Sequence, residues 1–346
     1  MKRKLTFSKA INEALEISLK RDRKVIVLGL GVDDPKGIFG TTKDLKKKFK
    51  SQVFDMPTAE NGFTGFSLGL AISGYKPIIT HQRVEFSLLS LEQIFNQIAK
   101  WFYMSNGKVN VPLVIRLIIG KGWGQGPQHS QSLESIFSHI PGLKVVSPHS
   151  AYDAKGLLIN SIKDPDPVIF FEHRWLHETN SIVPKKSYEV KLGKGNILKR
   201  GKDITIVSFS YAVIECLKAL KELKKYKVSA DIIDLRTIKP IDYKLIFSSV
   251  RKTKKLLIVD NGLKDFGIGS EISSKITEKF NIPINILGVL NIPIPSSPAI
   301  SKYCYPSVNE IIKSTLDMLK IKIKFKKTSD IIYGSDQPDK NFTGPF

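Results

Sequence analysis

Residues 111–119 read VPLVIRLII, and residues 120–130 continue directly as GKGWGQGPQHS. The apolar run is typical of a strand that is buried on both faces, and the glycines after it predict a loop. In α/β proteins, ligands bind at loops that follow the carboxyl ends of parallel strands. The stretch therefore predicts a parallel sheet with His129 at its carboxyl edge. A flexible loop in which Ser130 caps the next helix explains the same residues equally well.

Apolar runs and helical patterns alternate on both sides of this stretch, which is typical of an α/β domain. Further strands are predicted at 25–30, 77–80, 143–147 and 167–171. Helices are predicted at 7–22, 60–73, 87–105, 131–139 and 151–163. The pattern indicates a first domain over residues 1–180 with a parallel sheet at its centre.

A second α/β series begins after residues 181–202, which carry Pro184 and three glycines and are predicted to be a linker. Its strands are predicted at 203–209, 228–234, 256–260 and 284–289, and its helices at 211–225, 242–251, 268–280 and 307–320. The fold class is therefore α/β, with two parallel-sheet domains. The second domain spans 203–320, and residues 321–346 are expected to form an extended tail.

The composition fits a globular protein without covalent or metal cross-links. The chain has 346 residues, of which 42% are hydrophobic, enough to bury a sizeable core. It has no run of about 20 apolar residues that could span a membrane. Its two cysteines, Cys216 and Cys304, make neither a disulfide framework nor a metal-ligand cluster. We therefore expect a cytoplasmic protein with no metal site built from its own side chains.

The formal net charge of +22 raises the question of nucleic-acid binding. Only nine of the 54 basic residues are arginine, the residue favoured for base-edge and bidentate phosphate contacts. The lysines are also scattered over several predicted helices. We therefore do not expect a nucleic-acid partner, and attraction to an acidic protein partner explains the charge as well.

A carboxylate stands at the start of a predicted helix in DMPTAENGFTG, residues 55–65. Glu60 falls in the first turn of the helix predicted at 60–73. An acid at this place complements the helix dipole, which would be a purely structural role. A strand end followed by an acid at a helix start also suits a ligand site, so the residues alone leave both interpretations open.

Motifs in a fixed order resemble the β subunit of the decarboxylating component of 2-oxoacid dehydrogenases of the pyruvate dehydrogenase type. The motifs are DMPTAENGFTG, LEQIFNQIAKWFYMS, QHSQS, PGLKVVSP, DAKGLL, DPVIFFEH, DLRTIKPID, FGIGSEI and IPIPSSP. The resemblance covers roughly residues 5–320. It implies a transketolase-like pyrimidine-binding domain followed by a transketolase C-terminal domain. It also implies an oxidoreductase that decarboxylates a 2-oxoacid oxidatively and transfers the acyl group.

The resemblance also implies roles for individual residues. Glu60 matches the carboxylate that hydrogen-bonds the aminopyrimidine ring of thiamine diphosphate, where a partly buried acid can hold a shared proton. Phe86 matches the aromatic residue that packs on this ring. His129 matches a histidine that faces the substrate, to stabilise developing charge or to serve acyl transfer. Gln82 and Arg83 precede Phe86 and are expected to border the same pocket.

The resemblance further implies what other chains supply. The sequence has no G-D-G followed by N-N, the superfamily motif that holds Mg²⁺ and the diphosphate. In the split enzymes this motif belongs to the α subunit. An active site shared with an α subunit is therefore expected, in a heterotetramer of two α and two β chains that works with a lipoyl acyltransferase core. A structural K⁺ on backbone carbonyls is a further possibility, near Leu113, Ser161, Asp164 and Asp166.

Two departures from the family pattern fall near the expected cofactor. Gly29 is followed by Leu30, where relatives commonly carry glutamate. Residues 80–86 are also more polar than usual, and His81 or Arg83 would suit a larger or more anionic 2-oxoacid. Leu30 keeps open the alternative of a non-catalytic partner subunit. Acyl transfer to an acceptor other than a lipoyl domain is the other alternative.

Overall fold

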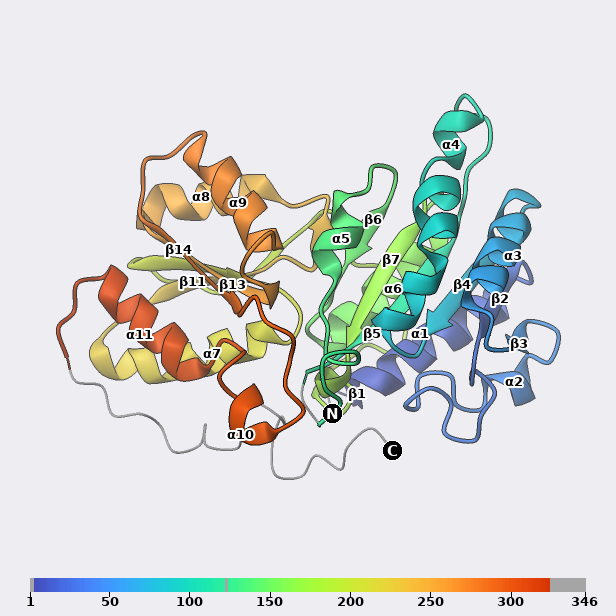
Figure 1. Ribbon diagram of the computed structural model, residues 1–346, viewed down its shortest axis with the longest axis horizontal. Helices are drawn as coiled ribbons and strands as arrows, with labels where there is room; N and C mark the ends of the chain where they lie inside the picture. The colour runs from blue at the N-terminus through green and yellow to red at the C-terminus, as the bar shows by residue number, and fades with distance from the viewer. Residues whose placement is uncertain (1–2, 122–123, 324–346) are drawn as a thin grey trace. The chain divides into compact units, whose positions relative to one another are not determined.

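Two units make up the chain, each built around a sheet (Figure 1). The computed structural model describes residues 3–121 and 124–323. Of these residues, the first unit holds 3–119 and 136–192, and the second holds 120–121, 124–135 and 193–323. No helix among the described residues is long and apolar enough to cross a membrane. Of the tail predicted over 321–346, residues 324–346 lie outside the described residues.

The sheet of the first unit is parallel, in the order β6-β7-β5-β4-β2-β3. Its strands are β2 (Val25–Gly29), β3 (Val53–Asp55), β4 (Lys76–His81), β5 (Val114–Ile119), β6 (Lys144–Val146) and β7 (Val168–His173). Every residue of β2, β5 and β7 is buried. This confirms the strands that were predicted from continuous apolar runs, because such runs suit strands covered on both faces.

Helices surround this sheet, and several of them differ from the sequence prediction. The helices are α1 (Phe7–Arg21), α2 (Leu45–Lys48), α3 (Glu60–Ile72), η1 (Val84–Ser90), η2 (Gln93–Ile98), α4 (Trp101–Met104), α5 (Glu134–His139), α6 (Ala151–Lys163) and η3 (Arg174–Leu176). The single helix predicted over 87–105 is instead a 3₁₀ helix, a π-helix and a short α-helix in succession. The spacing of apolar residues does not distinguish these three kinds of helix. Both η1 and η2 contact α3.

The second unit has a mixed sheet in the order β14-β13-β10-β11-β9. Its strands are β9 (Asn196–Lys199), β10 (Ile204–Ser208), β11 (Ala230–Asp234), β13 (Leu256–Leu263) and β14 (Ile284–Val289), with β12 (Thr237–Lys239) as a further short strand. Its helices are α7 (Ala212–Leu223), η4 (Lys224–Tyr226), α8 (Tyr243–Thr253), α9 (Ile268–Thr277), α10 (Pro298–Ser301) and α11 (Val308–Met318). Figure 1 shows α7 and α11 on one face and α8 and α9 on the other.

The segment predicted as a linker contains ordered strands. β9 pairs antiparallel with β11 at the edge of the second sheet. The strand β8 (Asn180–Ile182) pairs antiparallel with β1 (Lys4–Thr6) in the first unit. Both are short and only partly buried, so they lack the apolar runs that reveal buried strands in a sequence.

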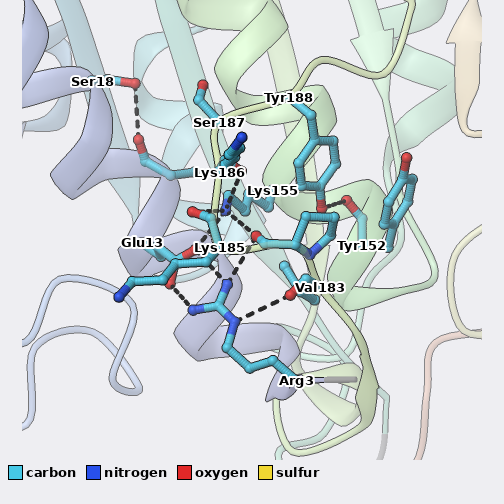
Figure 2. A network of polar contacts seen from close by, with 12 residues as sticks. Arg3, Glu13, Ser18, Tyr152, Lys155, Val183, Lys185, Lys186, Ser187 and Tyr188 are labelled. Atoms are coloured by element: carbon cyan, nitrogen blue, oxygen red, sulfur yellow. Dashed lines mark hydrogen bonds and ion pairs between the residues drawn. The ribbon is translucent and has the colours of Figure 1, made fainter. Parts of the chain in front are cut away.

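A buried lysine fastens the residues after β8 to the helices α1 and α6 (Figure 2). The side chain of Lys155, on α6, is fully buried and pairs with Glu13 on α1. Its ammonium also donates to the carbonyl of Pro184 at 2.7 Å and lies 5.2 Å from the Tyr188 ring centroid. Arg3 holds the same Glu13 carboxylate with two hydrogen bonds, of 2.8 and 2.9 Å. The buried charge is therefore fully compensated, as a charge away from water requires.

A second buried ion pair crosses the centre of the first sheet. Arg116 on β5 and Glu172 on β7 have side chains with 0% exposure, and two hydrogen bonds, of 2.5 and 2.9 Å, join them. Arg116 also donates to the hydroxyls of Thr80 and Thr41. Burial alone would raise the pKa of Glu172, but the charge and hydrogen bonds of Arg116, with the His177 imidazole 3.7 Å away, hold it below its usual value. The carboxylate therefore stays ionised in the core.

In the second unit, a buried acid anchors the segment that carries His129. Glu134 accepts a hydrogen bond from the Asn261 amide at 3.1 Å, and the same amide lies 3.4 Å from the Ser132 hydroxyl. Burial, reinforced by the nearby charge of Asp260, raises the pKa of Glu134 to about 7. Burial also raises the pKa of Asp260 to about 6, although hydrogen bonds from backbone amides lower it in part. Both acids hold protons at mildly acidic pH.

We predict that Glu172→Gln lowers the free energy of unfolding of the first unit by about 3–5 kcal/mol, because it leaves Arg116 buried without a countercharge. Urea denaturation followed by tryptophan fluorescence measures the change. Lys47→Gln is the control, since it removes an ion pair with Asp44 in which the lysine side chain is 83% exposed. The control should change the free energy by less than about 0.5 kcal/mol. Equal effects of the two substitutions would contradict a structural role for the buried pair.

We predict that Glu134 makes the second unit less stable as the pH rises. Its pKa of about 7 in the folded chain exceeds the ordinary value of 4.5. The stabilisation from its bound proton is thus complete below about pH 4.5 and is lost as the pH passes through about 7. The difference in unfolding free energy between wild type and Glu134→Gln should therefore change over this window. Glu278→Gln, at an exposed pair with Lys275, should leave the pH dependence unchanged; parallel curves for Glu134→Gln would refute the assignment.

Candidate active site

The carboxyl edge of the first sheet presents a buried acid. Glu60 is the first residue of α3, and only four residues separate it from the end of β3. The residue is 7% exposed. Within residues 3–121 and 124–323 its carboxylate makes no hydrogen bond or ion pair. The residue is largely buried, but its carboxylate oxygens still reach solvent. A ligand at the sheet edge could therefore bind them.

The amide of Gln82 holds the turn that follows β2. Its Nε2 donates to the carbonyl of Leu30 at 2.8 Å. A side chain at Gly31, where φ is +76°, would come within 2.5 Å of this nitrogen. Any other residue at position 31 would be strained by this φ and would have to push the Gln82 amide aside. Leu30 has no carboxylate, unlike the glutamate that relatives commonly carry here. Its backbone carbonyl instead holds the Gln82 side chain at the edge of the expected pocket.

An acid that the sequence analysis did not single out also reaches this turn. Asp55, the last residue of β3, accepts hydrogen bonds from the amides of Gly31 at 2.6 Å and Val32 at 3.1 Å. Burial raises the pKa of Asp55, and the negative charges of Asp33 and Asp34 raise it further. The two hydrogen bonds from Gly31 and Val32 lower it only in part. The place of Asp55 at the end of a strand, in the sequence DMP at residues 55–57, could have pointed to it. Asp55 orders the turn beside Gln82.

His81 and Phe86 flank the same strand end. His81, the last residue of β4, is 2% exposed, and its ring centroid lies 5.2 Å from that of Phe63 on α3. Burial lowers the pKa of His81 to about 3. The imidazole is therefore neutral, and His81 does not supply the positive charge that an anionic 2-oxoacid would need. Phe86 lies on η1 and is half-buried.

Two arginines share this edge. Arg83 precedes η1, and burial lowers its pKa, partly offset by the charge of Glu85. Arg174 follows β7 and is 6% exposed, and the sequence analysis gave it no role. No local pattern marks Arg174, because its place at this edge follows only from the order of strands in the sheet.

His129 lies in the second unit, whereas Glu60, Phe86 and Gln82 lie in the first. Its backbone amide donates to the carbonyl of Gly126 at 3.4 Å, and the residue is half-buried. The segment around it is tethered by Ser132 and Glu134, as described above. His129 thus follows a glycine-rich turn, as the sequence predicts.

Comparison with known families identifies both parts of the chain. Residues 3–178 match the transketolase pyrimidine-binding domain, and residues 193–311 match the transketolase C-terminal domain. A solved structure described as a split gene transketolase, inactive beta4 tetramer, superposes with a TM-score of 0.78. It covers 92% of this chain and 99% of its own, at 21% sequence identity, and it therefore supports the fold alone.

Curated relatives are similar over nearly the full length. The β subunit of acetoin:2,6-dichlorophenolindophenol oxidoreductase from Cupriavidus necator is 37% identical and covers 92% of this chain and 99% of its own. The mitochondrial pyruvate dehydrogenase E1 component subunit β of Drosophila melanogaster is 38% identical, and the match covers 93% of this chain and 91% of that protein. The Staphylococcus epidermidis pyruvate dehydrogenase E1 β subunit is 40% identical, and the match covers 80% of this chain and 85% of that protein. The chain therefore belongs to the transketolase-like oxidoreductase family of β subunits of the decarboxylating E1 component of 2-oxoacid dehydrogenases.

Proposed function

We propose that the chain is the β subunit of a thiamine-diphosphate-dependent 2-oxoacid dehydrogenase. Together with an α subunit it would decarboxylate a 2-oxoacid oxidatively and transfer the acyl group. The observation that carries this proposal is Glu60, a largely buried residue at the carboxyl edge of a parallel sheet whose carboxylate makes no hydrogen bond or ion pair within the described residues. Such an edge is the usual ligand-binding place in α/β folds.

The residues around Glu60 fit the aminopyrimidine ring of thiamine diphosphate. Glu60 would hold a proton shared with a ring nitrogen, which satisfies the buried carboxylate. Phe86 would pack on the ring, and Gln82 would border it from the turn after β2. When bound, the cofactor supplies the electron sink for decarboxylation, and the protein supplies position and proton exchange.

His129 is proposed to face the substrate carbonyl from the glycine-rich segment. Its side chain would stabilise charge that develops on the oxygen, or pass a proton during acyl transfer. An imidazole suits this task because its ordinary pKa lies close to neutral pH.

The Mg²⁺ ion is proposed to be held mainly by the α subunit. Mg²⁺ and the diphosphate would lie on the α subunit, since the chain lacks the G-D-G and N-N motif. A structural K⁺ on the carbonyls near residues 113 and 161–166 is less well supported. The carbonyls of Leu113 and Ser161 accept backbone hydrogen bonds, and Lys144 already pairs with Asp164 and Asp166. The ammonium supplies a positive charge at this place.

Exposed apolar side chains support the proposal of an α subunit in a tetramer of two α and two β chains. Leu89 on η1 is 66% exposed, Phe66 on α3 is 54% exposed, and Tyr103 on α4 is 88% exposed. Aromatic and aliphatic residues of this kind are enriched in protein interfaces. A lipoyl acyltransferase core would then accept the acyl group from the assembled enzyme.

We predict that turnover needs both chains. The β chain, co-expressed with a candidate α subunit, should decarboxylate a 2-oxoacid only when thiamine diphosphate and Mg²⁺ are present. A panel of 2-oxoacids assayed with an artificial electron acceptor measures this, with each chain alone as the control. Cofactor-independent activity, or full activity of the β chain alone, would contradict a split active site. Acyl transfer to an added lipoyl domain separates this function from transfer to a different acceptor.

We predict that Glu60→Gln lowers the turnover number of this complex by roughly 10²- to 10⁴-fold, the usual range for losing a proton-transfer group. The complex should still assemble, which size-exclusion chromatography tests. Glu16→Gln is the control, because it removes an acid of the same unit from an exposed pair with Lys48. Unchanged turnover in Glu60→Gln would instead favour the non-catalytic partner subunit that Leu30 keeps open.

A further inference from the structure

The stretch of chain that carries His129 belongs to the second unit. Residues 120–121 and 124–135 lie in this unit, whereas β5 before them and most of α5 after them lie in the first. The described residues between β5 and α5 form neither a helix nor a strand. Their place therefore depends on contacts with the rest of the second unit, and the position of His129 depends on the same contacts.

A lysine at the start of this stretch lies over two tyrosine rings. The Nζ atom of Lys121 is 5.1 Å from the centroid of the Tyr211 ring and 4.8 Å from that of the Tyr305 ring. Tyr211 directly precedes α7, and Tyr305 lies between α10 and α11. Both tyrosines are buried, so the packing of the second unit fixes their rings. An ammonium within about 6 Å of an aromatic face is attracted to it, and more strongly where water is excluded.

Ser296 contacts the middle of the stretch. A side chain at Gly126, where φ is +68°, would come within 2.7 Å of the Ser296 hydroxyl, and one at Gly124, where φ is +67°, within 3.5 Å of the Ser296 carbonyl. Glycine permits this approach and this conformation, but it also leaves the backbone freer than other residues do. Side chains at the two ends must therefore order the stretch, and Glu134 does so at the far end through Asn261.

The attraction between Lys121 and the rings depends on its proton. Desolvation lowers the pKa of Lys121 to about 8, the charge of Glu215 on α7 raises it in part, and the charge of Lys218 on the same helix lowers it. The phenol groups of the two tyrosines are the other titratable groups at this contact. The ammonium is therefore charged at neutral pH and loses its proton as the pH rises through about 8. Because the rings attract the charged form, the contact weakens over the same range.

We propose that Lys121 is a positioning residue for His129: its ammonium, held by the rings of Tyr211 and Tyr305, fixes the start of the glycine-rich stretch and thereby the place of the imidazole. This inference rests on the proposed function, since it concerns the histidine proposed to face the substrate. Lys121 acts through His129 and contacts neither substrate nor cofactor. An imidazole that stabilises charge or passes a proton must lie within hydrogen-bond distance of its target, so a displaced imidazole lowers the turnover number.

Kinetics of the assembled complex of both subunits test this role. Lys121→Met removes the charge and keeps the length of the side chain. It should lower kcat about five- to thirtyfold with little change in KM, as expected for the loss of a desolvated cation–π contact. Lys121→Arg should restore most of the activity, because a guanidinium is also attracted to aromatic faces. Lys279→Met is the matched control and should behave as wild type, because it removes an exposed ammonium that lies 4.7 Å from the Phe247 ring elsewhere in the second unit.

The pH profile separates positioning by the charge from a purely structural role. In wild type, kcat should fall as the pH passes through about 8, where Lys121 loses its proton. This fall should move to higher pH in Lys121→Arg, since arginine stays charged there. It should be absent in Lys121→Met, whose kcat is already low at neutral pH. Identical profiles in wild type and Lys121→Met would contradict the proposal.

Hydrogen exchange tests the same contact without turnover. Amides of residues 124–133 should exchange at least about fivefold faster in Lys121→Met than in wild type at the same pH, whereas Lys121→Arg and Lys279→Met should match wild type. Tyr305→Leu removes one ring, and the double variant with Lys121→Met should lose less protection than the two single variants added together. If the complex decarboxylates no 2-oxoacid, the exchange rates still decide whether Lys121 holds the stretch. Unchanged exchange in Lys121→Met, fully additive losses, or faster exchange with an unchanged kcat would each overturn the proposal.

Discussion

The first unit depends on one ion pair that is shut off from water. Arg116 and Glu172 join β5 to β7, and the same guanidinium reaches Thr80 on β4 and Thr41 in the loop after β2. Buried charges are tolerated only when every donor and acceptor has a partner, so the pair forces these elements into one arrangement. The positions of the residues at the carboxyl edge of the sheet therefore depend on this ion pair.

At this edge, neighbouring ionisable groups are driven to different states by their surroundings. His81 is neutral because it lies among apolar groups, whereas Glu172 is ionised because Arg116 faces it. Glu60 is largely buried, and its carboxylate makes no hydrogen bond or ion pair within the described residues. A ligand with a matching hydrogen-bonding group would give this carboxylate a partner, and a ligand without one would not, which favours binding of the first.

The sequence predicts those parts of the fold that local composition controls. β2, β5 and β7 were found because their runs are apolar on both faces, and α1 because its apolar residues follow the helical period. The edge strand β9 and the broken helix after residue 84 were missed, because tertiary packing decides both. The start of α3 at Glu60 was predicted correctly, but its role came from family resemblance alone. Arg174 and Phe39 could not be paired without the strand order.

The left-handed turn over 37–40 ties the end of β7 to the core. A strained turn stays ordered only as long as its anchors do, and its anchor is Thr41 on the buried Arg116. A change that loosens β5 would therefore also release Phe39, whose ring packs on the guanidinium of Arg174. Substitutions deep in the sheet would then disturb Arg174 at the carboxyl edge, although they lie far from it in the sequence.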